Sequence, residues 1–226
     1  MLLSLLGLLP LTTHGANPAV HQVDVAVYCD NPGGVTAAIQ VARMGKKVLL
    51  ISPNGHPGGL TASGLGYTDI GNIAILGGLS HEFHHRAYLH YQKPEAWTFE
   101  KQDQFANKGQ GGPALDHQHQ LASTFEPKVA EAIFRAMLEQ NKVKVVIDRL
   151  DRSTIQMKDR RIESIRLERS GDTVQAGMFI DASYEGDLMA LAGVTFTVGR
   201  EANATYGELG NGIVGPLGKN QLPKGI

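Results

Sequence analysis

The chain has 226 residues, 42% of them hydrophobic and 19% charged, and a formal net charge of −1 at pH 7. This composition is that of a globular protein with room for a sizeable core. No long basic run occurs, which argues against nucleic acid and against an anionic membrane surface as partners. Because Cys29 is the only cysteine, an internal disulfide is excluded.

Residues 1–15 predict a secretory signal peptide, because an apolar run too short to span a bilayer as a helix is followed by small residues. No Lys or Arg precedes this run, so the usual basic start of a signal peptide is missing. An apolar first strand or helix is the alternative interpretation. With the signal removed, we expect a secreted or periplasmic protein without an integral membrane segment.

A strand, a helix and a second strand are predicted at residues 23–28 (VDVAVY), 33–45 and 47–51 (KVLLI). Two apolar strands joined by a helix favour a parallel pair with a right-handed crossover. The turn after the first strand then lies at the carboxyl edge of the sheet, where α/β folds bind ligands.

That turn reads C-D-N-P-G-G at residues 29–34, where a dinucleotide-binding turn reads G-x-G-x-x-G. Only Gly34 keeps its glycine. Asn31 tolerates a left-handed backbone, but its side chain would crowd a phosphate. The second strand ends at Ser52 instead of an acid that binds both ribose hydroxyls, which weakens such a site roughly tenfold. No Arg stands next to Ser52 in the sequence to support a 2′-phosphate, and a βαβ unit that only packs is the alternative.

The rest of the chain predicts further elements. We expect a helix at 79–91, a long loop at 92–122, an amphipathic helix at 126–140, a third strand at 142–148, an antiparallel β-meander at 149–180, a helix from 185 to 192 and a loop-like tail from 209 to 226.

Residues 81–85 (HEFHH) fit the H-E-x-x-H pattern of zinc metalloproteases, with His81 and His85 as ligands and Glu82 as general base. Arg86 follows directly, where an active-site helix is normally uncharged, and Asp116, His117 and His119 are the third-ligand candidates. A polar helix rich in histidine is the simpler interpretation. No G-x-S-x-G motif occurs, which argues against a hydrolase triad.

Four segments, taken together, resemble the FAD-dependent oxidoreductase family with a glutathione-reductase-like FAD-binding domain, and most closely its secreted bacterial branch. They are DVAVYCDNPGGVTAAIQVARMGKKVLLIS, HPGGLTASGLGYTDIGN, FEPKVAEAIFRAML and MFIDASYEGDLMALAGVTFTVGREANATYGE. The resemblance covers most of residues 23–208 and implies an α/β, Rossmann-like FAD/NAD(P)-binding fold with a parallel sheet, helices and an antiparallel β-meander.

The resemblance also implies which residues would bind FAD. Their places are the pyrophosphate, the adenosine ribose, the flavin side, the adenine and the segment that closes over the nucleotide. The residues are Asn31, Pro32, Gly33, Gly34, Ser52, Gly58, Gly59, Leu60, Thr61, Ser63, Gly64, Val146, Ala182 and Ser183. No side chain is nominated as catalytic, because in flavoenzymes the cofactor carries the redox chemistry.

The chain departs from the family's pattern in three ways. The family's turn usually reads G-G-T-P-A-G, its second strand usually ends in Glu, and its chains run well beyond 226 residues. We therefore expect the N-terminal, FAD-binding portion of an oxidoreductase acting on an unknown small molecule. A non-catalytic or decayed remnant of the same fold is the alternative, and a zinc protease is a remote one.

Overall fold

The computed structural model describes residues 17–66, 68–69, 71–105, 113–208 and 211–212. The predicted signal peptide and nearly all of the predicted tail lie outside these residues. The chain divides after Ala192 into two compact units. The second of them contains one short helix, α7 (Asn203–Tyr206), among its described residues.

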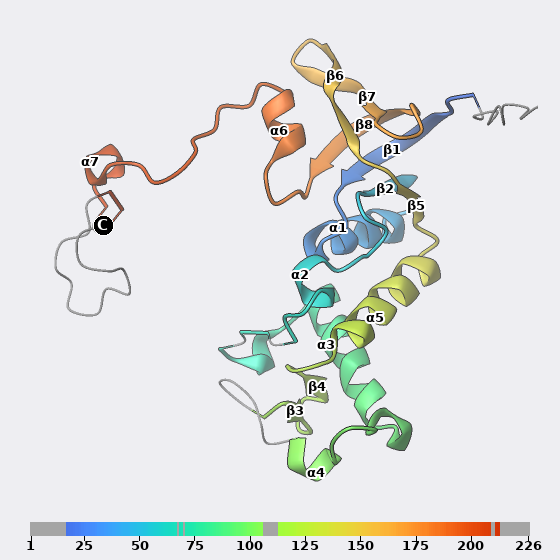
Figure 1. Ribbon diagram of the computed structural model, residues 1–226, viewed down its shortest axis with the longest axis vertical. Coiled ribbons are helices and arrows are strands. Elements are labelled where there is room, and N and C mark those ends of the chain that lie inside the picture. Colours follow the sequence, from blue (N-terminus) through green and yellow to red (C-terminus); the bar gives the residue numbers. More distant parts are fainter. Residues whose placement is uncertain (1–16, 67, 70, 106–112, 209–210, 213–226) are drawn as a thin grey trace, which may run out of the picture. The chain divides into compact units, whose positions relative to one another are not determined.

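The first unit is built on a six-stranded sheet with the order β5-β2-β1-β8-β7-β6 (Figure 1). The parallel part consists of β5 (Lys144–Ile147), β2 (Val48–Ser52), β1 (Val20–Tyr28) and β8 (Thr173–Asp181). The antiparallel part continues from β8 through β7 (Arg161–Leu167) to β6 (Leu150–Lys158). The predicted α/β fold with a parallel sheet and a β-meander is therefore confirmed.

The helices α1 (Pro32–Arg43), α3 (Gly78–Tyr91) and α5 (Pro127–Gln140) match the three long helices expected from the sequence. The stretch 92–122, expected to be one long loop, instead contains short elements within its described residues. These are η2 (Pro94–Ala96), α4 (Gln102–Phe105), β3 (Leu115–Asp116) and β4 (Leu121–Ala122). The other short helices of the first unit are α2 (Gly59–Ala62), η1 (Ile73–Ile75) and α6 (Asp187–Leu191).

Strand β2 and the last three residues of β1 are buried because both faces of the sheet are covered there. Val27 and Leu50 are register partners, fully buried on the helix side together with residues of α1 and α5. Ala26 and Leu49 are also partners and face the meander. Figure 1 shows α1 and α5 on one side of the parallel strands and β6 and β7 on the other.

The register brings the carboxyl ends of the parallel strands to one edge. Tyr28 is paired with both Ile51 and Asp181, and Ser52 is paired with Ile147. The turn after β1, the loop after β2 and the segment after β8 therefore meet. Among the helices of the described residues, none has the length and apolar character needed to cross a bilayer.

Candidate nucleotide-binding site

A cleft of about 460 Å³ lies where these strand ends meet. Its walls come from the turn after β1, the loop after β2, helix α2 and the segment after β8, with Arg149 and Arg152 at the start of β6. The volume lies within the range of small-molecule sites, and the position is the one at which open α/β sheets bind ligands.

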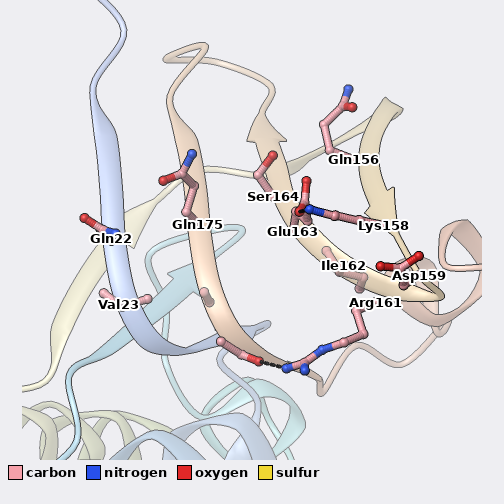
Figure 2. A pocket seen from close by; sticks show the side chains of 12 residues that line it. Gln22, Val23, Gln156, Lys158, Asp159, Arg161, Ile162, Glu163, Ser164 and Gln175 are labelled. Atoms are coloured by element: carbon pink, nitrogen blue, oxygen red, sulfur yellow. Dashed lines mark hydrogen bonds and ion pairs between the residues drawn. The ribbon is translucent and has the colours of Figure 1, made fainter.

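A second hollow, of about 610 Å³, lies on the meander and contains mainly polar side chains (Figure 2). It is bordered by Gln22 and Val23 from the first half of β1, away from the carboxyl end of that strand. Arg161 crosses it and donates a hydrogen bond to the Gly177 carbonyl at 3.1 Å. We therefore place the candidate site in the cleft and not in this groove.

The turn after β1 keeps the backbone shape of a dinucleotide-binding turn without its first glycines. Cys29 has φ = 80°, a left-handed conformation that glycine adopts more readily. Asn31 caps α1, accepting a hydrogen bond from the Gly34 amide at 2.9 Å on its Oδ1. Its Nδ2 donates to the Ala182 carbonyl, which ties the turn to the segment after β8.

Gly34 serves the close packing that the third glycine of the fingerprint provides. A Cβ atom at this position would overlap the carbonyl oxygen of Cys29 and would lie 3.2 Å from the Cβ of Ala182. A Cβ on Gly33, in contrast, would meet only the Asn31 side chain, at 3.3 Å. The first turn of α1 therefore depends on glycine at residue 34 and not at residue 33.

Ser52 is 1% exposed and does not face the cleft directly. Its hydroxyl donates a hydrogen bond to the Asp30 carboxylate and accepts one from the Gly55 amide at 2.8 Å. Burial raises the pKa of Asp30, and the bond from Ser52 only partly offsets this, so that the pKa lies above its ordinary value. The Asp30 carbonyl also accepts from the Gly58 amide at 2.7 Å, which joins the turn to the Gly-Gly loop.

The Gly-Gly loop needs both of its glycines. Gly58 has φ = 113° and Gly59 has φ = 49°. A Cβ on Gly58 would approach the Phe134 ring to 2.6 Å. The next residue, Leu60, donates its amide hydrogen to the Tyr184 hydroxyl at 3.1 Å, so Tyr184 spans the cleft from the segment after β8.

The segment after β8 is a self-bonded turn. Asp181 accepts hydrogen bonds from the Ser183 amide and hydroxyl, at 2.9 and 2.7 Å. The Ser183 hydroxyl in turn accepts from the Gly186 amide at 2.9 Å. Asp187 accepts from Arg152 at 2.6 Å, which fixes one side of the cleft opening. These hydrogen bonds hold the segment 181–187 (DASYEGD) in place at one side of the cleft.

A family model described as FAD dependent oxidoreductase matches residues 24–220. The chain belongs to the FAD-dependent oxidoreductase family. A comparison with curated proteins gives no match.

Comparison with solved structures finds similar chains at low sequence identity. L-amino acid deaminase from Proteus vulgaris is 12% identical with a TM-score of 0.50, over 83% of this chain and 54% of that one. L-proline dehydrogenase from P. horikoshii is 14% identical with a TM-score of 0.48, over 81% of this chain and 59% of that one. The chain therefore spans little more than half the length of these two enzymes.

The residues of this oxidoreductase domain fit a dinucleotide in three respects. The left-handed Cys29 makes the turn, Gly34 permits the close approach of α1 to β1, and the cleft lies at the carboxyl edge of the sheet. Two backbone amides at this edge already have partners within the chain, because Asn31 accepts from Gly34 and Tyr184 accepts from Leu60.

Some of the predicted site residues line the cleft, and the others lie in the elements around it without lining it. The predicted residues that line the cleft are Asn31, Gly59, Leu60, Ser63 and Ser183. Ser52 lines an adjoining hollow, and Val146 lies in β5 as the register partner of Ile51. Pro32, Gly33, Gly34, Gly58, Thr61, Gly64 and Ala182 belong to the elements around the cleft without lining it. Their contacts with a nucleotide stay predictions.

Sequence reasoning missed several cleft residues, namely Asp30, Asn54, His56, Arg149, Arg152 and Tyr184. The arginines come from β6 and the residue before it, far along the chain from the turn, so no local pattern indicates them. Tyr184 and Asp30 both lie in segments that resemble the family. Their position in these segments could have indicated that they line the site.

The side chains of the H-E-x-x-H motif contact other groups of the chain. His81 and His85 stack at 6.1 Å between ring centroids, and Glu82 accepts from Arg43 and Arg86. Partial burial raises the pKa of Glu82, but the bonds from the two arginines outweigh it and hold the pKa below the ordinary value. An ion-paired carboxylate of this kind is a poor general base. Within the described ranges, no three His, Cys, Asp or Glu side chains are grouped so that they could hold a metal ion.

Proposed function

We propose that this chain binds FAD in the cleft and forms the FAD-binding portion of an enzyme that oxidises or reduces a small molecule. The observation that carries the proposal is the convergence of the turn after β1, the Gly-Gly loop and the DASYEGD segment at the carboxyl edge of the sheet. These three segments also carry the resemblance to the family in the sequence. The substrate is undetermined, and secretion stays a prediction from residues 1–15.

FAD, when bound, supplies the redox chemistry, and the chain's task is to hold and orient it. Asn31, Gly59 and Leu60 present the backbone that would face the pyrophosphate. Ser183 would close the site from the segment after β8. Of the two arginines that line the cleft, Arg152 is paired with Asp187, so Arg149 would be the cationic side chain that faces an anionic cofactor.

A non-catalytic remnant of the family is the second candidate function. It is favoured by one observation, namely that Asn31 and Tyr184 already accept from two amides at the cleft edge. If these hydrogen bonds prevent the two amides from binding a phosphate group, the chain keeps the fold of the family without binding the cofactor.

FAD titration of the purified chain separates the two candidates. We expect saturable binding, seen as a change in the flavin visible spectrum and fluorescence and reversed by excess ADP.

In Tyr184→Phe the Leu60 amide loses its internal acceptor, so FAD affinity should stay the same or rise a few-fold. Lys158→Ala, in the groove of Figure 2, serves as the control and should leave affinity unchanged. A wild-type chain that is folded by circular dichroism but takes up no FAD contradicts the proposal, and the remnant is then supported if Tyr184→Phe binds.

A further inference from the structure

We infer that Asp30 supplies, from the turn after β1, the carboxylate that the family usually carries at the end of β2, and that it selects nucleotides with a free ribose 2′-hydroxyl. This inference rests on the proposed function, because it assigns a role to one residue of the same nucleotide site. It concerns the two positions at which the fingerprint is broken, Asp30 beside the altered glycines and Ser52 at the end of β2.

The two unusual residues are hydrogen-bonded to each other. Ser52, at the position of the family's acid, donates its hydroxyl to the Asp30 carboxylate, and both side chains are buried. A carboxylate therefore lies beside the end of β2 although the residue there is a serine. The Gly55 amide bonds to the Ser52 hydroxyl at 2.8 Å and so fixes the direction in which that hydroxyl points.

Asp30 stands in the wall between two hollows. One is the cleft already described, and the other, also of about 460 Å³, is bordered by Asp30, Ser52 and the edge strand β5. Val145 and Ile147 of β5 present apolar side chains to this adjoining hollow, with exposed fractions of 41% and 59%. An apolar wall next to a carboxylate matches an adenosine, which has a flat ring and a pair of vicinal hydroxyls.

The charge and hydrogen-bonding capacity of Asp30 suit this role. An ionised carboxylate can accept about four hydrogen bonds, and Ser52 supplies one, so acceptor capacity remains for hydroxyl donors. Burial raises the pKa of Asp30, and the bond from Ser52 and the nearby His56 and Arg135 partly offset this effect. Hydrogen bonds to a charged acceptor are stronger than those to a neutral hydroxyl such as Ser52 alone would offer.

A purely structural role for Asp30, holding the turn against β2, makes a different prediction. In that case Asp30→Asn alters all nucleotides alike, because the amide oxygen still accepts from Ser52. A role in ribose recognition alters only nucleotides that carry the 2′-hydroxyl. Comparing ADP with 2′-deoxy-ADP separates these possibilities without any need for catalytic activity.

The test is isothermal titration of the full chain with both nucleotides. We expect the wild type to prefer ADP by about tenfold, and Asp30→Asn to lose that preference through weaker ADP binding. Asp159→Asn, in the turn between β6 and β7, is the matched control and should keep the preference. The double variant Asp30→Gly/Ser52→Glu returns the acid to the end of β2 and should recover it, which keeps the test informative if Asp30→Asn does not fold.

Two results overturn the inference and leave the proposed function standing. One is a wild type that binds ADP and 2′-deoxy-ADP equally, and the other is an Asp30→Asn chain that keeps the preference. If the folded wild type binds neither nucleotide nor FAD, the proposed function itself fails.

Discussion

At the scale of single residues, the two departures from the dinucleotide fingerprint are one structural feature. In the sequence, Asp30 and Ser52 are separate losses, 22 positions apart. In the structure they share a buried hydrogen bond, because the parallel pairing of β1 and β2 sets their ends side by side. No arginine stands next to Ser52 in the sequence, but two arginines bond to the loop after β2 in the structure. Arg135 donates to the Gly55 carbonyl at 2.6 Å and Arg149 to the Asn54 side chain at 3.0 Å.

Asp30→Asn should change the pH dependence of stability with a sign set by burial. Burial raises the pKa of Asp30 in the folded chain, so the folded state binds this proton more tightly than the unfolded state. Its stabilising contribution is therefore present at low pH and is lost as the pH rises through the folded pKa. We expect the free energy of unfolding of the variant, relative to wild type, to increase as the pH rises above about 4, the ordinary pKa of an aspartate carboxyl. Urea unfolding followed by circular dichroism measures it, and a relative stability that falls over this range contradicts it.

At the scale of elements, local patterns sufficed where an element is long and periodic. The helices α1 and α5 and the strands β1 and β2 follow from apolar spacing, because each buries a face or both faces in the core. The short elements within 92–122 were missed, because two-residue strands such as β3 are defined by their partner and not by a pattern of their own. The residues that line the cleft were predictable only in part, because several of them reach it through tertiary contacts and not through a local sequence pattern.

The two neighbouring glycines at the start of α1 should respond oppositely to substitution by alanine. Gly34→Ala places a Cβ onto the Cys29 carbonyl oxygen, a backbone atom that cannot move alone, and should cost about 1–3 kcal/mol. Gly33→Ala meets only the capping oxygen of Asn31, at 3.3 Å, which needs to shift by a few tenths of an ångström, and alanine favours a helix, so the substitution should be neutral or stabilising by up to about 1 kcal/mol. Thermal and urea unfolding of both variants provide the measurement. Equal costs at the two positions would show that α1 does not pack on β1 as described.

At the scale of the whole molecule, the cleft is contained in one of the two compact units. Its lining residues run from Tyr28 to Asp187, and the chain divides after Ala192. The family model nevertheless extends to residue 220, beyond the last residue of the cleft. The sequence similarity therefore covers both units, whereas the described residues that line the cleft belong to the first.

Limited proteolysis can test that assignment in the intact chain. Residues 193–200 are exposed throughout and contain no helix or strand, and Phe196 within them is 52% exposed. Brief chymotrypsin treatment should therefore cut at Phe196 before it cuts the buried aromatic residues of the first unit, such as Phe83 and Phe134. Because none of the described residues after Asp187 lines the cleft, the cut protein should bind ADP within about twofold of the intact chain. Mass spectrometry locates the cut, and titration before and after it measures affinity. A tenfold loss of ADP affinity with the first unit still folded would assign part of the nucleotide site to residues beyond 196.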